Sequence, residues 1–312
     1  IELTNICNYR CAFCPSFTRK SGYMSPELLE NILKNVNFKK NQLVHLHYHG
    51  ESLLHPKLGK MISLCKQYGL TVGLSTNASL LNEQKSREII ESELDQLIIA
   101  FDGVSKEIYE KYRIGGNYEQ VKENIQNFLK LKEKNNSQKP FTDLHVIKLT
   151  ESLPLIDKFL SYWKTTPIDQ ITLKSYSTRG GQVKQNLAKT ENWYYGKRNK
   201  RYPCMWFWST VIILCDGRVV PCCHDMQGKI ILGDLTKNTM QEIWNGKKII
   251  TLRKNEIAGN YEKKLCIDCN EWIGTPSGIT GFIWNTLKKN FRKITRTSLA
   301  GEIFEVVYRK QQ

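Results

Sequence analysis

Apolar residues along the chain follow two alternating periodicities. Short runs rich in aliphatic residues are separated by longer segments in which apolar residues recur every three or four positions, as on one face of a helix. In the segment 25–36, Ser25 is a suitable N-cap and Pro26 stands at the first helical position. The pattern predicts helices between six strands, which are residues 1–7, 42–50, 70–77, 94–103, 141–150 and 170–178.

Strands that alternate with helices in this way favour an α/β fold with a parallel sheet and helical crossovers. Six such units are too few for a closed eight-stranded barrel, so residues 1–180 are predicted to form a partial (β/α)6 TIM-like barrel. In folds of this kind the functional residues lie at the C-terminal ends of the strands. The residues that follow each predicted strand are therefore the candidates for a functional site.

Composition and charge narrow the class of protein. No apolar run of eighteen residues occurs, so a membrane span is not predicted, and no secretory signal pattern is present. Ten cysteines in 312 residues, some clustered and some isolated, are typical of metal sites in a reducing compartment, which favours a cytoplasmic protein. The net charge of +16 is interpreted as a solvated basic surface, because no zinc-finger, RRM-like or basic-zipper pattern indicates a nucleic-acid partner.

Three cysteines follow the first predicted strand closely. Cys7, Cys11 and Cys14 are spaced C-x3-C-x2-C, with the aromatic Phe13 directly before the third. A single disulfide would leave one thiol over, and a tetrahedral zinc site would need a fourth ligand. Thiolates are soft anionic ligands that suit iron–sulfur clusters as well as zinc.

This motif resembles that of the radical S-adenosylmethionine (SAM) superfamily. The resemblance implies that the three thiolates hold three irons of a [4Fe–4S] cluster. The fourth iron is then left open for the amine and carboxylate of SAM, as a catalytic metal requires.

The second predicted strand ends in Tyr48, His49, Gly50 and Glu51. They stand where the family has a Gly-Gly-Glu motif that holds the SAM amino group, with His49 in place of the first glycine. A carboxylate beside an ammonium group is a favourable charge pairing. Since His49 alternates with two earlier histidines along the strand, the three share one face, and a polar lining of the barrel is favoured over a zinc site.

Further resemblances follow the third and fourth strands. The family pattern implies that Ser75 and Asn77 contact the SAM ribose and that Arg113 faces the SAM carboxylate. Ala100 occupies the place of a serine that touches the ribose in the family, and Asn77 could replace that contact. Asp102 is expected to bind SAM or substrate, or to cap the turn that follows it.

A second cysteine pattern occurs late in the chain. Cys204 and Cys222 are separated by seventeen residues, and Cys266 and Cys269 follow as C-x2-C. This resembles the auxiliary-cluster module called SPASM, and because no cysteine follows Cys269, the short Twitch form with one [4Fe–4S] cluster is expected over residues 181–275. Cys223 could replace Cys222 as a ligand. A plain four-cysteine zinc site is the alternative.

The chain therefore resembles a radical SAM enzyme with two [4Fe–4S] clusters. In module length and cysteine spacing it is similar to aminocyclitol dehydrogenases. The resemblance implies oxidation of an alcohol carbon on a sugar or cyclitol, with the auxiliary cluster as electron acceptor and a flavodoxin or ferredoxin as reductant. Lys174 and Arg179 are the candidates for a general base, or for binding an anionic group of the substrate. The alternatives are a peptide maturase that forms a thioether or carbon–carbon link, and a non-catalytic iron–sulfur or zinc-binding scaffold.

The tail, residues 276–312, lies beyond the resemblance. Seven basic and two acidic residues give residues 281–312 a net charge of +5. The apolar residues of this tail that recur at helical spacing are Trp284, Leu287, Phe291 and Ile294. We expect this amphipathic helix to dock on the barrel rather than on an anionic membrane.

Overall fold

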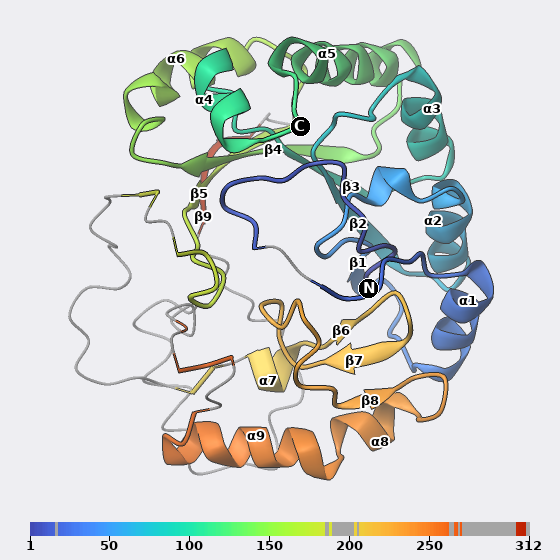
Figure 1. The fold of residues 1–312 in the computed structure, drawn as a ribbon. Helices are drawn as coiled ribbons and strands as arrows, with labels where there is room; N and C mark the ends of the chain where they lie inside the picture. The colour runs from blue at the N-terminus through green and yellow to red at the C-terminus, as the bar shows by residue number, and fades with distance from the viewer. Residues whose placement is uncertain are drawn as a thin grey trace.

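The computed structural model describes residues 1–15, 18–184, 187–188, 203–204, 206–261, 265–267 and 269, and the backbone of 304–309. An open sheet curves around the centre of the molecule, with helices on its outer face (Figure 1). Its strands, in spatial order, are β1 (Leu43–His45), β2 (Thr71–Thr76), β3 (Gln96–Ala100), β4 (Phe141–Lys148), β5 (Gln170–Ser175) and β9 (Phe304–Arg309). The pairs from β1 to β5 are all parallel, whereas β9 runs antiparallel to β5.

The helices that connect these strands form where the apolar periodicity predicts them. They are α1 (Pro26–Asn35), α2 (Leu58–Gln67), α3 (Glu83–Glu91), α4 (Lys106–Tyr112), α5 (Tyr118–Lys134) and α6 (Ile156–Trp163). Ser25 accepts a hydrogen bond from the backbone N–H of Leu28 and so caps α1 as predicted. The predicted α/β architecture and partial barrel are confirmed in the described residues.

The prediction of a first strand at residues 1–7 is wrong. This segment makes only an isolated antiparallel bridge, from Thr4 to Tyr23, and does not join the sheet. Its hydrogen bonds are divided between two parts of the molecule, because the Ile1 amine donates to the carbonyl oxygen of His45 while the Glu2 N–H donates to that of Ile213. The sixth strand of the sheet is instead β9, from the C-terminal tail. The tail helix predicted over residues 284–294 lies outside the described residues.

A smaller unit lies below the open barrel in Figure 1. Its three-stranded sheet is made of β6 (Ile212–Ile213), β7 (Arg218–Val220) and β8 (Gly233–Asp234), and its helices are α7 (Trp206–Ser209), α8 (Met240–Trp244) and α9 (Lys247–Ala258). The predicted hairpin is confirmed, since β6 and β7 pair antiparallel and Gly217 in the turn has a φ of +88°. Buried residues of both units, such as Leu3 and Val219, belong to one continuous apolar core.

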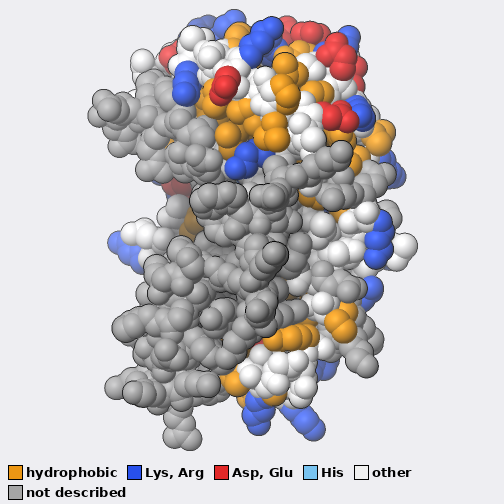
Figure 2. Space-filling model, turned by 90° about the vertical axis from the view of Figure 1, so that its left-hand side faces the viewer, with side chains coloured by type: hydrophobic (Ala, Val, Ile, Leu, Met, Phe, Trp, Pro, Cys, Tyr) orange, Lys and Arg blue, Asp and Glu red, His pale blue; other side chains and the backbone are white. Residues whose placement is uncertain are grey.

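Basic and acidic side chains are interspersed on the upper part of the face shown in Figure 2. The described part of that face therefore carries both signs of charge around its hydrophobic side chains. None of the helices that the structure describes is both long and apolar enough to span a bilayer.

Candidate functional site

The loop that carries the three N-terminal cysteines is fixed on the segment that follows α4. The N–H of Arg10 donates to the carbonyl oxygen of Ile114, and the N–H of Ala12 donates to that of Tyr112, both at 2.9 Å. Gly115 has a φ of +94°, and a Cβ atom there would lie 3.3 Å from the carbonyl oxygen of Asn8. Two close backbone segments therefore determine the path of the cysteine loop, which crosses the open barrel in Figure 1.

The thiols of this loop lie near one another, and two of them accept hydrogen bonds from N–H groups. The Cys7 sulfur accepts from the Tyr9 N–H at 3.5 Å, and the Cys11 sulfur accepts from Arg113 Nη1 at 3.8 Å. Burial raises the pKa of Cys7 to about 11, and the nearby Cys11 and Cys14 add to that shift. Hydrogen bonds to the ligand sulfurs are a feature of iron–sulfur sites, and the donor set fits a cluster held at three points.

A site for a single metal ion requires that its ligand side chains converge on one point. Among the described residues, no three Cys, His, Asp or Glu side chains converge closely enough to hold one metal ion. Thiolates that each bind a different iron need not converge on one point. The three-cysteine loop is compatible with a cluster in this respect.

Arg113 lies between the cysteine loop and the end of β3. Its Nε and Nη2 atoms donate to one carboxylate oxygen of Asp102 at 2.8 and 2.6 Å, and its guanidinium lies 4.9 Å from the centre of the Phe13 ring. The other oxygen of Asp102 accepts from the N–H of Ile147 at 2.6 Å. Asp102 thus holds Arg113 in place, rather than merely capping a turn.

Glu51 is buried, and its carboxylate joins the segment that follows β1 to the end of β2. One oxygen accepts from the Leu53 N–H at 3.0 Å and from the Thr76 hydroxyl at 2.7 Å, and the other accepts from the Asn77 N–H at 2.8 Å. Burial raises the pKa of Glu51 despite these donors. The segment 48–51, which the resemblance assigns to SAM binding, is called the SAM motif. Ser75 stands one residue before Thr76, so this motif and the predicted ribose contacts are neighbours.

The amide of Asn77 is held by its surroundings. Its Nδ2 donates to the side-chain oxygen of Asn8 at 3.0 Å, and its oxygen accepts from the N–H and hydroxyl of Ser79. These contacts connect the end of β2 to the cysteine loop. The role of Asn77 toward a ribose stays a prediction.

Gly50 packs against the N-terminal segment so closely that no side chain fits. A Cβ atom there would lie 2.2 Å from the carbonyl oxygen of Thr4 and 2.8 Å from that of Ile6. Since a backbone oxygen cannot move aside as the end of a flexible side chain can, glycine is required here. The match of Gly50 to the family motif therefore has a steric reason in this chain.

The two residues before Gly50 contact the late cysteine loop. The Tyr48 hydroxyl donates to the carbonyl oxygen of Cys222 at 3.4 Å, and the His49 Nε2 lies 3.1 Å from the carbonyl oxygen of Cys223. Burial, with the nearby charge of Arg179, lowers the pKa of His49 to about 3, so the imidazole is neutral at neutral pH. Tyr48 and His49 thus both connect the SAM motif to the segment that carries Cys222.

In the C-terminal unit, three of the predicted auxiliary ligands, Cys222, Cys266 and Cys269, lie near the fourth, Cys204. Burial raises the pKa of Cys204, and the neighbouring thiols of Cys269 and Cys266 add to the shift. A hydrogen bond with the Cys223 thiol, then burial and the proximity of Cys204, raise the pKa of Cys222. Cys222 is the more buried of the adjacent pair, and its thiol lies near that of Cys204.

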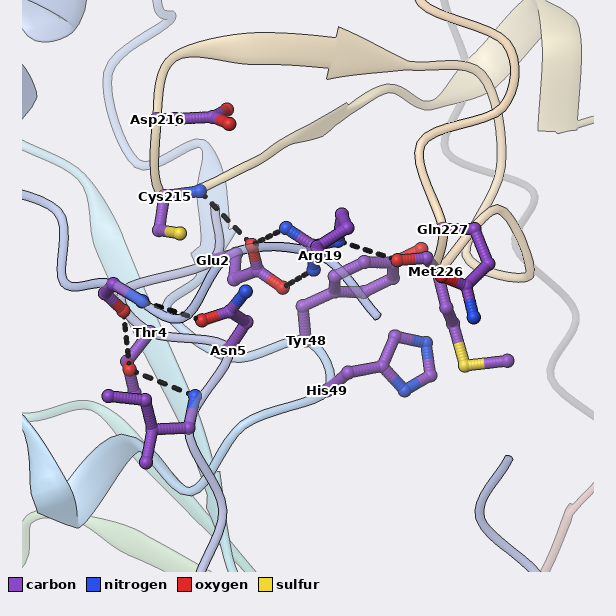
Figure 3. Close-up of polar contacts among 12 residues, drawn as sticks. Glu2, Thr4, Asn5, Arg19, Tyr48, His49, Cys215, Asp216, Met226 and Gln227 are labelled. Carbon is purple, nitrogen blue, oxygen red and sulfur yellow. Dashed lines mark hydrogen bonds and ion pairs between the residues drawn. The ribbon is translucent and has the colours of Figure 1, made fainter. Parts of the chain in front are cut away.

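A buried ion pair joins the N-terminal segment to the same region (Figure 3). The two terminal nitrogens of Arg19 donate to the two carboxylate oxygens of Glu2 at 2.9 and 2.5 Å, and its Nε donates to the carbonyl oxygen of Met226 at 2.6 Å. Glu2 also accepts from the N–H of Cys215 at 3.1 Å. Arg19, a few residues beyond Cys14, therefore connects the first cysteine loop to the second.

Comparison with known proteins agrees with this arrangement. Residues 1–152 match the model of the radical SAM superfamily, and residues 204–270 match that of SPASM, an iron–sulfur cluster-binding domain. The chain therefore contains a radical SAM domain and a SPASM domain. The family resemblance seen in the cysteine motifs is confirmed, and with it the cofactors, which are [4Fe–4S] clusters and SAM.

Two curated relatives span most of this radical SAM protein. The tungsten-containing aldehyde ferredoxin oxidoreductase cofactor-modifying protein of Pyrococcus furiosus is 21% identical over 309 residues, which cover 86% of each chain. The S-adenosyl-L-methionine-dependent 2-deoxy-scyllo-inosamine dehydrogenase of Niallia circulans is 23% identical over 279 residues, which cover 86% of this chain and 91% of the dehydrogenase.

Solved structures share the fold. BtrN in complex with AdoMet and 2-DOIA superposes with a TM-score of 0.54 at 18% identity, over 86% of this chain and 90% of BtrN. Streptococcus suis SuiB bound to the precursor peptide SuiA gives a TM-score of 0.66 at 11% identity, over 80% and 64% of the two chains. These likenesses establish the partial barrel of the radical SAM domain and its C-terminal unit.

The two candidate bases of the radical SAM protein lie in different surroundings. Lys174, near the end of β5, lies close enough to His47 to lower its pKa, although burial is the larger cause. Arg179 follows β5 with a φ of +53°, and its charge opposes the rise in the pKa of Cys14 that burial causes. A non-glycine residue in the left-handed region is strained and is often found at functional sites. Arg179 is thus placed beside the cluster loop, and Lys174 inside the barrel.

Several polar residues of the site were not predicted from the sequence. Asp143 on β4 is buried and accepts hydrogen bonds from His145, Gln170 and Thr172, which form a polar network inside the barrel. The predicted polar lining also includes His45 and His47, whose ring centres are 5.0 Å apart. Polar residues in otherwise apolar strands were the available signal for this network.

Proposed function

We propose that this radical SAM protein is a dehydrogenase that oxidises an alcohol carbon of a sugar or cyclitol to a ketone. The observation that carries the proposal is the direct contact between the SAM motif and the auxiliary cysteine loop, through Tyr48 and His49. An electron acceptor in that position lies next to the site where a substrate radical would form. The sequence similarity to the Niallia circulans dehydrogenase, which extends over 86% of this chain, supports the same reaction class.

The residues of the barrel have positioning roles in this reaction. Cys7, Cys11 and Cys14 would hold the cluster, which would supply the electron for reductive cleavage of SAM and so the radical chemistry that removes a hydrogen atom from the substrate. Glu51 fixes the motif that faces the SAM amino group, and Arg113 presents a cation toward the SAM carboxylate. Fixed geometry of this kind matters because small misplacements of the reacting atoms are costly in rate.

The oxidation then requires two further losses from the substrate. The carbon has lost a hydrogen atom to the 5′-deoxyadenosyl group, so the hydroxyl must lose a proton and the radical must lose an electron. Cys204, Cys222, Cys266 and Cys269 would hold the auxiliary cluster, which would accept this electron. Lys174 or Arg179 takes the hydroxyl proton when deprotonated, or else binds an anionic group of the substrate while water takes the proton. A flavodoxin or ferredoxin supplies the electron that starts the cycle.

A peptide maturase is the second candidate function. SuiB, whose structure contains its precursor peptide, shares the fold with a TM-score of 0.66. In that case a peptide side chain would occupy the space between the two sites, and the product would carry a thioether or carbon–carbon link. The nature of the product separates the two candidates.

The test is a turnover assay with a panel of polyols and aminocyclitols deuterated at the alcohol carbons. The wild-type enzyme should transfer deuterium into 5′-deoxyadenosine and release a ketone, both scored by mass spectrometry. The Cys266→Ala, Cys269→Ala variant should form 5′-deoxyadenosine but little ketone. Ketone formation at the wild-type rate in that variant would show that the auxiliary site is not the acceptor, and a cross-linked peptide product would favour the maturase.

A further inference from the structure

Arg113 contacts both a cluster ligand and a buried carboxylate. Its Nη1 lies 3.8 Å from the Cys11 sulfur, while its Nε and Nη2 donate to Asp102. The side chains of Arg113 and Asp102 are 9% and 3% exposed, so solvent screens their charges weakly. The guanidinium therefore acts on Cys11 from a fixed position in a region of low dielectric.

A backbone N–H group also fixes the position of Asp102. Its second oxygen accepts from the N–H of Ile147 at 2.6 Å, where β4 ends. The Phe13 ring lies against the guanidinium, with 4.9 Å between the ring centre and Cζ. These contacts leave the ion pair little freedom to turn away from Cys11.

We propose that Arg113 and Asp102 together set the reduction potential of the cluster bound by Cys11, with Arg113 raising it and Asp102 lowering it. Reduction adds a negative charge to the cluster, and a cationic N–H donor to a ligand sulfur stabilises that added charge. The carboxylate of Asp102 opposes the effect, because it lies on the other side of the same guanidinium. The inference rests on the cluster site alone and holds for a dehydrogenase or a maturase.

Loss of Arg113 and loss of Asp102 are expected to shift the reduction potential in opposite directions, which distinguishes this electrostatic role from a structural one. A variant that merely loosens the loop would change solvent access to the cluster, and loss of either partner would then move the potential in the same direction. The reduction potential is measured without SAM, so that any role of Arg113 in binding the SAM carboxylate does not affect the result. A matched control is the ion pair of Lys132 and Asp169, which is also partly buried in the barrel domain.

The experiment is a potentiometric titration of the full chain, reconstituted anaerobically and followed by EPR. The radical SAM cluster is identified as the one whose signal changes when SAM is added to a parallel sample. Arg113→Gln should shift its potential to more negative values and Asp102→Asn to more positive values. Arg113→Lys, which keeps the charge but loses the planar fork, should shift less than Arg113→Gln. Lys132→Gln and Asp169→Asn should leave the potential unchanged.

Shifts of the same sign in Arg113→Gln and Asp102→Asn, or no shift in either, would overturn the proposal. If Arg113→Gln fails to retain its iron, the reduction potential of the Asp102→Asn variant alone decides between the two outcomes. A positive shift in that variant supports the pair, and a negative shift or none contradicts it.

Discussion

At the scale of single residues, the site is built from buried charges that have specific partners. Glu51 shows this most clearly, because its carboxylate accepts hydrogen bonds from three donors, one in the segment that follows β1 and two at the end of β2. A buried carboxylate is tolerated only when it is hydrogen-bonded, and its removal leaves those donors unsatisfied. Glu51 therefore supports the shape of the SAM motif as well as contributing its charge.

We expect Glu51→Ala to lower the free energy of unfolding by roughly 1–3 kcal/mol. The affinity for SAM should fall as well, because the segment that carries Gly50 loses its anchor. Thermal denaturation and equilibrium SAM binding measure the two effects. Glu83→Ala is the control, since the Glu83 side chain is 72% exposed, its ion pair with Arg87 should contribute less than about 1 kcal/mol, and SAM affinity should be unchanged. Unchanged stability and SAM affinity in Glu51→Ala would show that this carboxylate is dispensable.

At the scale of elements, the parallel strands and their helices were predictable and the connections between the two units were not. The strands from β1 to β5 and the cap at Ser25 follow from local periodicity and capping chemistry. The segment at residues 1–7 has an equally apolar pattern, yet the hydrogen-bond partner of the Glu2 N–H lies at Ile213, more than two hundred residues away. Partners that distant leave no trace in a local pattern.

The candidate site likewise contains residues that the sequence could predict and contacts that it could not. The cysteines, Gly50 and Glu51 were recognisable because their chemistry or sterics restrict which residue can stand there. The partners of the predicted residues were not, since the pairing of Arg113 with Asp102 and of Arg19 with Glu2 depends on how separate loops meet. The strand β9 is a further example, because its sheet partner β5 precedes it by more than a hundred residues.

The Glu2–Arg19 pair makes a prediction at this scale. Glu2→Gln should lower the free energy of unfolding by about 3–5 kcal/mol, because it leaves a buried guanidinium without its counter-charge. The iron content should fall toward that of one cluster, since Arg19 also holds the backbone of Met226 near the auxiliary cysteines. Glu30→Gln is the control, because the exposed Lys34–Glu30 pair should contribute less than about 1 kcal/mol. Equal stability of Glu2→Gln and wild type would argue against this connection.

At the scale of the whole molecule, two cysteine groups lie on either side of one contact region. The first group is carried by a loop across the open barrel, and the second by the C-terminal unit below it in Figure 1. Tyr48, His49 and Arg19 reach from the first unit to the loop between Cys222 and Gln227. The arrangement places a substrate radical, if it forms at the SAM motif, close to the auxiliary site.

Iron content tests this two-site arrangement. Anaerobically reconstituted protein should hold about eight irons per chain, and the Cys7→Ala, Cys11→Ala, Cys14→Ala variant should keep about half of them. The Cys266→Ala, Cys269→Ala variant should also keep about half, from the other site. Iron and sulfide assays with EPR measure both. Zinc in place of iron at the four late cysteines would contradict the auxiliary cluster.

The measurement that tests the central claim most directly is the yield of 5′-deoxyadenosine from SAM. The wild-type protein, loaded with iron and sulfide and reduced with dithionite, should produce 5′-deoxyadenosine and methionine, quantified by liquid chromatography and mass spectrometry. The Cys7→Ala, Cys11→Ala, Cys14→Ala variant should produce none above the protein-free background. Absence of 5′-deoxyadenosine from fully loaded wild type, or equal amounts from the triple variant, would contradict the account.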